Sequence, residues 1–447
     1  MGTGRRLIVL LLALTLIGVP AAVLRVACVG ASCRSTAAEA STPAPFCSLP
    51  ADLRSLIDAG TYENRSPDAM AVTGSTPVVS VVGNGMKVPW PSVDAGQRAA
   101  MQAPLWFLGR GIREGQLPHD VELDQVAPTL EPLLGLHRPY ADVRSGTAIA
   151  GVAEDGMTTP LVVLIAWKGI GELDRKLALR RLMHRADVLE TPPKPDGGGK
   201  LIGVAQAHRY LRGVGTAAGS ASAGSLPLDP TAVEATIGTG GLPAEHGITG
   251  TKLRGEAGTV DRSFRSASSG SVIATLGDDL DETTGGRALI GLIGETSDLG
   301  LTGDNWYHDG RIVDRMVAPA TPVGSQIDPF IGGGWGADDT PDILGVALSG
   351  DEGEDERATA TIERTVLQAV PSATIVVAGT GSLHAPNAVR APSPPGTATA
   401  AAGGLFVEHD APAQQLVDGL EASTAPDGAP LFADAFVSYA VRFGSYC

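Results

Sequence analysis

Aromatic residues, cysteine and basic charge are all scarce in this chain. Phe, Trp and Tyr make up only 4% of the 447 residues, and 33 Lys and Arg side chains face 49 Asp and Glu, for a formal net charge of −16. Nucleic-acid-binding proteins carry a basic patch or stripe, so the charge balance argues against nucleic acid as a partner. An acidic surface of this kind mainly favours solubility.

Cysteine occurs only four times, and the 399 residues between Cys47 and Cys447 contain none. An exported chain permits disulfides, and three pairings of four cysteines are possible. The layout favours a Cys47–Cys447 disulfide that joins the two ends of the globular part. Cys28 and Cys33 would then stay unpaired or be removed with the N-terminal segment.

The N-terminus has two basic residues followed by an apolar run. Arg5 and Arg6 precede an uncharged stretch over residues 7–24. This order is typical of an export signal, and the stretch is also just long enough to span a bilayer. Residues 1–33 are therefore a cleaved signal or a membrane anchor, and the positive-inside rule places the remainder outside the cell. We expect an exported protein, anchored in the cell membrane or secreted, with residues 34–46 as a linker.

Short apolar runs separated by Gly and Pro are what the chain has in abundance. Hydrophobic residues make up 43% of it, beside 58 glycines and 32 prolines. Runs of this kind are expected to form buried strands, here over residues 78–82, 103–112, 160–167, 288–294, 341–348 and 373–378. Helical patterns lie over residues 49–59, 123–135, 174–184, 272–283 and 360–370.

The alternation of strands and helices predicts an α/β domain over residues 47–384, with a mostly parallel central sheet and helices on both faces. Residues 385–403 are rich in Pro, Ala and Gly and are expected to form a long loop. Residues 404–447 are expected to form a helical segment, with helices over 405–420 and 431–443, packed on the main domain near Cys47.

One stretch, residues 230–250 (PTAVEATIGTGGLPAEHGITG), carries a pattern with chemical meaning. Thr231 lies in a Pro-Thr turn before a short helical pattern, which Gly240 and Gly241 end. A helix N-terminus presents free N–H groups and a positive dipole end, which suits a phosphate held beside a hydroxyl nucleophile. The alternative is a glycine-rich turn around a buried helix.

This stretch resembles the nucleophile loop and following helix of the type I phosphodiesterase branch of the alkaline phosphatase superfamily. In that branch a Thr or Ser before a helix is followed by TG, P and HGI, which stand here as Thr239-Gly240, Pro243 and His246-Gly247-Ile248. Residues 103–146 are similar to the segment that closes such domains, yet here they come first. The resemblance thus implies a circularly permuted fold, with a duplication or an unrelated α/β domain as the alternatives.

The resemblance also implies two metal ions, usually zinc, one of which activates the nucleophile. The strand ends match that expectation poorly. Lys168 stands where the family has a ligand Asp, and its charge could replace a metal cation. Asp351 matches an expected ligand and Asp355 stands where a His would be, so the pair could bind calcium or magnesium or belong to a solvated acidic loop. His384 follows the strand at 373–378, which ends without an Asp-His pair.

Two functions remain open at this point. In the first, the protein is a non-catalytic relative that binds a small phosphate ester or a cell-surface partner, with Lys168 in place of a cation. In the second, it is a metal-dependent phosphoric or sulfuric ester hydrolase with Thr231 as nucleophile and Lys168 beside it. Its zinc, magnesium or calcium ligands would be Asp351, Asp355 and His384.

We assign Gly240 and His246 to the ligand-binding loop. The resemblance implies that the His246 ring is hydrogen-bonded in the turn after the helix, so it is not a certain metal ligand. Two carboxylates and no certain His favour the non-catalytic function.

Overall fold

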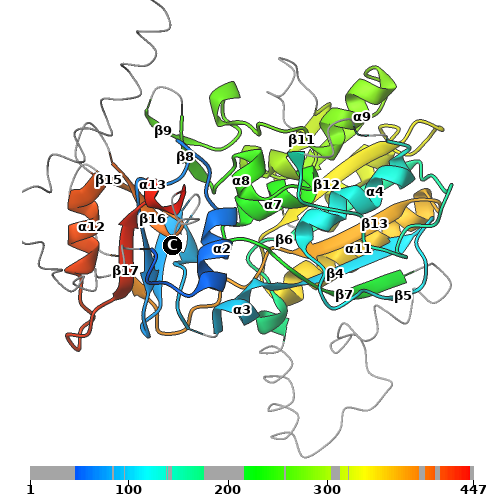
Figure 1. Cartoon of the computed structure of the whole chain (residues 1–447). Helices are drawn as coiled ribbons and strands as arrows, with labels where there is room; N and C mark the ends of the chain where they lie inside the picture. The colour runs from blue at the N-terminus through cyan, green and yellow to red at the C-terminus, as the bar shows by residue number, and fades with distance from the viewer. Residues whose placement is uncertain are drawn as a thin grey trace, which may run out of the picture. The chain divides into compact units, whose positions relative to one another are not determined.

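A computed structural model describes residues 46–442 except 83–84, 95, 137, 139–142, 176–215, 256–257, 304–312, 321, 392–397 and 408–412. Its centre is an eight-stranded sheet with the order β11-β10-β12-β6-β13-β4-β7-β5 (Figure 1). In chain order the strands are β4 (Gln102–Gly109), β5 (Gly115–Gln116), β6 (Leu161–Trp167), β7 (Thr216–Ser222), β10 (Ile290–Ile293), β11 (Arg315–Val317), β12 (Asp342–Leu348) and β13 (Thr374–Gly379). β4 alone runs antiparallel to its neighbours, so the predicted mostly parallel sheet is confirmed.

Strand β6 explains why this sheet is buried on both faces. All seven residues of its sequence LVVLIAW are buried. Side chains alternate between the two faces of a strand, so Val162 and Leu164 join one hydrophobic core while Val163 and Ile165 join the other. A continuous apolar run is what a strand covered on both faces requires.

Helices cover both faces of the sheet, as the sequence predicts. One core contains side chains from α4 (Val126–Leu130), α7 (Pro230–Thr239) and α9 (Leu276–Thr284). The opposite core contains side chains from α10 (Asp328–Ile331) and α11 (Glu352–Ala369). The 3-10 turns η1 (Leu123–Gln125), η2 (Glu131–Leu134) and η5 (Thr296–Leu301), with the short helices α3 (Gly96–Met101) and α8 (Pro243–His246), complete the connections.

Three smaller sheets accompany the central one. β15 (Ala398–Ala401), β16 (Gly404–Val407), β1 (Ala69–Thr73) and β17 (Phe432–Val437) form an antiparallel sheet against which α12 (Ala413–Glu421) packs. β14 (Val389–Arg390), β2 (Val78–Val82) and β3 (Met86–Pro89) form the second, and β8 (Lys252–Arg254) and β9 (Val260–Arg262) form a hairpin. α2 (Ala51–Ala59) and α13 (Tyr439–Arg442) lie near the two ends of the described chain.

The smaller sheets correct several predictions. Residues 78–82 form a strand, but it belongs to the three-stranded sheet and not to the central parallel one. Residues 385–403 are not simply a loop, because they include β14 and β15. The helix expected at residues 431–443 is wrong for most of its length, since β17 occupies Phe432–Val437. Its apolar residues serve two cores, with Ala435 in one and the adjacent Phe436 in another, and a strand presents both faces in this way.

The acidic run after β12 also differs from expectation. It is not a solvated loop, because α11 begins at Glu352, eight residues before the predicted helix start, and Asp351 caps it by accepting a hydrogen bond from the Glu354 N–H. Acidic residues in a first helical turn are favoured by the helix dipole. The expected helix over residues 174–184 lies outside the described residues beyond Arg175.

The start of the described chain lies against its C-terminal strand, at the place predicted near Cys47. The Phe46 N–H donates to Asp434 Oδ2 at 3.0 Å, and the Phe46 and Phe436 ring centroids are 5.0 Å apart. Cys47 is disulfide-bonded, but Cys28, Cys33 and Cys447 all lie outside the described residues, so a Cys47–Cys447 pair stays a prediction. No helix in the described part of the chain is long and apolar enough to cross a membrane. The N-terminal segment and the linker are likewise not described.

The contact between α7 and η5 yields a stability prediction. A Cβ on Gly238 would lie 2.1 Å from the Gly300 carbonyl oxygen, whereas one on the exposed helical Gly419 meets nothing within 4 Å. Gly238→Ala should therefore lower the unfolding free energy by about 1–3 kcal/mol through overpacking. Gly419→Ala should raise it by about 0.5–1 kcal/mol, because alanine loses less backbone entropy. Denaturant unfolding measures both, and a neutral Gly238→Ala would contradict the contact.

Candidate functional site

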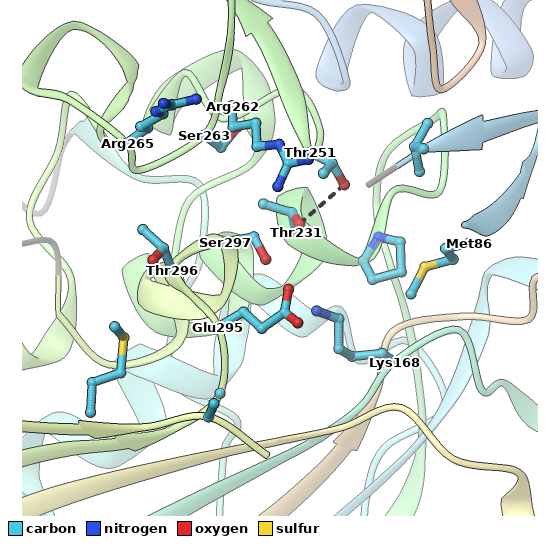
Figure 2. Close-up of a pocket in the computed structure, with 15 residues that line it drawn as sticks. Met86, Lys168, Thr231, Thr251, Arg262, Ser263, Arg265, Glu295, Thr296 and Ser297 are labelled. Carbon is cyan, nitrogen blue, oxygen red and sulfur yellow. Dashed lines mark hydrogen bonds between the residues drawn. The ribbon is translucent and has the colours of Figure 1, made fainter. Parts of the chain in front are cut away.

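A cavity of about 590 Å³ lies beside the carboxyl ends of β6 and β10 and the start of α7 (Figure 2). Ligand sites of parallel α/β sheets usually occur at this edge. Its lining residues come from the central sheet, the α7 start, the β8–β9 hairpin and the small sheet of β2 and β3: Val82, Met86, Lys168, Pro230, Thr231, Thr251, Arg262, Ser263, Arg265, Gly294, Glu295, Thr296, Ser297, Met316 and Ala318. Thr231 and Lys168, the two residues predicted for catalysis, are thus brought to one cavity.

Asp229 holds the two threonine hydroxyls in place. As the N-cap of α7 it accepts a hydrogen bond from the Thr231 N–H at 3.0 Å, and Thr251 Oγ1 lies 3.0 Å from its Oδ1 and 3.1 Å from its Oδ2. Thr251 uses its proton on Asp229, so its oxygen can accept from the Thr231 hydroxyl, 3.3 Å away. The Thr231 hydroxyl can thus donate to Thr251 or turn its proton toward a ligand in the cavity.

This cap changes what the helix start can offer. Pro230 has no N–H, and the Thr231 N–H is engaged by Asp229. The first two helical residues therefore supply no free N–H to a ligand, contrary to the sequence argument for a phosphate held by helix donors. Any anion at this place must be bound chiefly by side chains.

Lys168 lines the cavity and lies at the centre of a cluster of buried carboxylates. Its ammonium forms an ion pair with Asp298 and lies 3.9 Å from Glu234 Oε2. The side chains of Lys168, Asp298 and Glu234 are only 10%, 2% and 0% exposed. Burial alone would lower the Lys168 pKa, but the Glu234 and Asp298 carboxylates outweigh that effect and raise it. Lys168 is therefore a permanent cation.

Burial disfavours the charged form of two carboxyl groups at the site, Glu234 and Asp229. Burial raises the pKa of Glu234 well above its ordinary value, and Asp298 adds to the rise against the opposing effect of Lys168. Neither Glu234 oxygen has a hydrogen-bond partner among the described residues, and a protonated carboxyl can donate to a neighbouring carboxylate. Burial also raises the pKa of Asp229, while hydrogen bonds from Thr251 and Thr231 oppose the shift. Burial thus favours the protonated form of Glu234 beside the ion pair of Lys168 and Asp298.

Two arginines supply positive charge on the cavity wall. Arg262 ends β9, and Arg265 follows three residues later; both are exposed. Neither guanidinium forms an ion pair with a carboxylate in the described part of the chain. Between them, Phe264 adopts a left-handed φ of +61° with its ring fully buried, a strained conformation for a non-glycine residue. This turn buries the phenylalanine and leaves both arginines at the cavity.

Gly240 and His246, assigned to ligand binding, do not line the cavity. Gly240 ends α7 with a φ of +78°. His246 is fully buried, its Nδ1 accepts from the Ile248 N–H at 3.0 Å, and its Nε2 lies 3.1 Å from Thr236 Oγ1. Burial, helped by Arg65, lowers the His246 pKa to about 3. The ring is a neutral structural group in the turn after the helix, as the resemblance implies.

Asp351 and Asp355 act in the first turn of α11. Asp351 caps it, and Asp355 Oδ1 accepts from the Gly350 N–H at 3.0 Å. Neither these two nor His384 lines the cavity. Over the described ranges, no group of three or more His, Cys, Asp or Glu side chains could hold a metal ion. Their role as metal ligands stays a prediction without support from the geometry.

The carboxylates around Lys168 and the two arginines were not predicted from the sequence. The sequence did contain a sign of Asp298, because this residue follows β10 in the segment GETSD. Residues that follow several parallel strands of this sheet lie near the cavity. Glu234 is the one charged residue in the apolar start of α7. Nothing local marks Arg262 or Arg265, because only the tertiary fold brings the β8–β9 hairpin to the α7 start.

Comparison with known proteins identifies no relative of this chain. No family model matches the chain, and neither a curated protein nor a solved structure resembles it significantly.

His246 gives a pH prediction with a definite sign. Its folded pKa lies near 3 and its unfolded pKa is about 6.5, so the unfolded chain binds the extra proton. The stability due to the neutral ring is complete above pH 6.5 and falls by about 1.4 kcal/mol per pH unit as the pH drops toward 3.

The pH effect is measured by denaturant unfolding of the wild type and His246→Asn. The gap in unfolding free energy between them should shrink from pH 6.5 downward. Exposed His119→Asn is the control, and its gap should not show this slope. A constant gap for His246→Asn would show that the ring is not a buried neutral group.

Lys168 gives a second prediction for the site. Lys168→Met removes one partner of a buried ion pair and leaves Asp298 unpaired, which should lower the unfolding free energy by about 3–5 kcal/mol. Lys168→Met with Asp298→Asn should recover part of that loss. The exposed Lys87→Met is the matched control. A Lys168→Met protein as stable as the control would mean that the cluster has no structural role.

Proposed function

We propose that this protein is an exported, non-catalytic relative of the alkaline phosphatase-like enzymes, which binds the anionic group of a phosphate or sulfate ester in the cavity before α7. The observation that carries the proposal is the pair Arg262 and Arg265, two cations without a carboxylate partner in the described structure, on the wall of one cavity. In a chain with a net charge of −16, cations left unpaired at a cavity favour an anionic ligand.

The chemistry of the wall suits a tetrahedral oxyanion. A guanidinium presents N–H donors in a planar fork that matches phosphate oxygens. The hydroxyls of Thr231 and Thr296 line the same cavity and can rotate to donate to a ligand, whereas the Ser297 hydroxyl already donates to Asp298 Oδ1 at 3.1 Å. Figure 2 shows Arg262 directed toward Thr231 and Thr251, so one ligand oxygen could meet the guanidinium and a hydroxyl together.

The residues present do not fit a two-metal centre. The Lys168 ammonium already occupies the space between the buried carboxylates Asp298 and Glu234. The nearby His246 directs both ring nitrogens at protein partners. The positive charge that a metal cation would supply between these two carboxylates therefore comes from Lys168.

A second candidate is ester hydrolysis with Thr231 as nucleophile. The chain of hydrogen bonds from Thr231 to Thr251 to Asp229 favours it, because a raised Asp229 pKa makes that carboxylate a better proton acceptor. A proton leaving Thr231 during attack could pass through Thr251 to Asp229. Without a metal, the arginines would have to stabilise the charge that develops on the phosphoryl oxygens.

Anion binding is tested on the purified chain with inorganic phosphate and inorganic sulfate. Phosphate should raise the midpoint of thermal unfolding, as expected for a ligand of the folded state. Loss of one charge-assisted contact costs about 1.5–3 kcal/mol, so Arg262→Gln should weaken phosphate binding at least tenfold. Exposed Arg364→Gln on α11 is the matched control and should bind as the wild type does. Equal affinities in all three proteins would contradict the site.

The same preparations separate binding from hydrolysis. Wild-type protein should not turn over an aryl phosphodiester, and elemental analysis should find no stoichiometric metal. Turnover that disappears in Thr231→Ala would favour the second candidate instead.

A further inference from the structure

The cavity wall carries a hydrogen-bond acceptor of full negative charge as well as donors. Glu295, the exposed residue just before η5, lines the cavity together with Arg262 and Arg265. Figure 2 shows its carboxylate directed into the cavity next to Lys168, with Thr231 between it and the Arg262 guanidinium in this view. A ligand that fills this cavity therefore faces a carboxylate as well as the two arginines.

The neighbouring lysine does not neutralise Glu295. The Lys168 ammonium pairs with Asp298 and lies near Glu234, both of which are buried, and it forms no ion pair with Glu295 in the described structure. The Ser297 hydroxyl, also on the wall, donates to Asp298 Oδ1 at 3.1 Å, so it offers lone pairs toward the cavity. The η5 side of the cavity thus supplies acceptors, whereas the end of the β8–β9 hairpin supplies donors.

A carboxylate acceptor distinguishes oxyanions by whether they carry a proton. An ionised carboxylate accepts hydrogen bonds but cannot donate one, and it repels an oxygen of like charge. The monoanion of a phosphate monoester has a P–O–H group that can donate to it, because the second pKa of such an ester is about 6. A sulfate monoester or a phosphodiester carries the same single negative charge but no such proton. A polar group that the wrong ligand leaves unpaired is an effective source of specificity.

We propose that Glu295 makes the site specific for a singly protonated phosphate monoester. Arg262, Arg265 and the Thr231 hydroxyl bind the ionised phosphoryl oxygens, and the P–O–H group of the ligand donates to the Glu295 carboxylate. This assignment rests on the function proposed above and adds to it the class of ester. It removes sulfate esters and phosphodiesters from the preferred ligands.

The test compares two ligands of nearly equal size and equal charge. At about pH 5, ethyl phosphate and ethyl sulfate are both monoanions, and only the phosphate carries a hydroxyl proton. Calorimetry on the purified full chain should show at least about tenfold tighter binding of ethyl phosphate, which corresponds to one charge-assisted hydrogen bond. Diethyl phosphate, a diester without a proton, should bind about as weakly as ethyl sulfate.

Glu295→Gln tests the residue itself, because the amide keeps the shape of the side chain and can donate as well as accept. The variant should bind ethyl sulfate more tightly than the wild type does, and its preference for ethyl phosphate should largely disappear. A gain of sulfate binding cannot result from loss of the fold. Glu421→Gln, at the exposed end of α12 and outside the cavity lining, is the matched control and should keep the wild-type preference.

The pH profile is a second measurement. From about pH 6 upward ethyl phosphate loses its remaining proton, so its affinity for the wild type should fall by up to about tenfold per pH unit, whereas ethyl sulfate has no proton to lose. The other charged groups on or directly behind the wall are the two arginines, Lys168, Asp229, Glu234 and Asp298. These groups are unchanged in Glu295→Gln, so the fall specific to ethyl phosphate should vanish there.

The outcomes separate failure of this assignment from failure of the proposed function. If ethyl phosphate and ethyl sulfate bind the wild type equally, or if Glu295→Gln keeps the wild-type preference, the assignment is overturned and anion binding stands. If aminoethyl phosphate binds more tightly than ethyl phosphate and loses this advantage in Glu295→Gln, the carboxylate pairs with a ligand ammonium and the assignment is also overturned. If neither inorganic phosphate nor any ester binds, the proposed function has failed and the assignment fails with it.

Vesicles identify the source of the monoester. The chain is mixed with phosphatidylcholine vesicles that contain either phosphatidic acid, a lipid monoester, or phosphatidylglycerol, a lipid diester. Selective recruitment to phosphatidic acid supports the proposal with a lipid as the source. Recruitment to neither, together with tighter binding of ethyl phosphate than of ethyl sulfate, supports it with a soluble monoester. Equal recruitment to both lipids contradicts it, because the diester headgroup has no proton to donate to Glu295.

Discussion

The ion pair between Lys168 and Asp298, with Glu234 beside it, is the interaction on which the site depends. It joins three separate parts of the fold: the end of β6, the start of η5 after β10, and the interior of α7. A buried charge without a partner is costly, so these three segments are held in one arrangement. That arrangement places the start of α7, and with it Thr231, at the edge of the cavity.

The same ion pair explains the chemistry that the cavity can perform. A metal ion bound by Asp298 and Glu234 would need the space that the Lys168 ammonium takes. A lysine ammonium supplies one fixed positive charge but, unlike a metal ion, no Lewis-acid position for a substrate oxygen. Positive charge for a ligand comes instead from Arg262 at the end of the β8–β9 hairpin and from Arg265 after the strained turn at Phe264. An anion can be bound in such a site without being activated for attack.

The elements predicted best are the central strands, which are packed on both faces of the sheet. β6, β12 and β13 are uninterrupted apolar runs, and such runs have few alternatives to a buried strand. β17 was predicted as a helix because its apolar residues are mixed with polar ones, and the antiparallel partner β1 that makes it a strand is more than 350 residues away in the chain. α11 was predicted too short, because the capping role of Asp351 was not considered. Long-range pairing and capping were thus the sources of error.

By itself, the sequence determined the α/β class, the central strands, and the placing of Thr231 at a helix start and Lys168 at a strand end, because these depend on local apolar pattern and turn residues. Only the tertiary structure decided which charges meet. The partners of Lys168 lie 66 and 130 residues away in the chain, and the arginines reach the cavity through a hairpin. Electrostatic interactions depend on distance and burial in space, and neither is contained in the local pattern of a sequence.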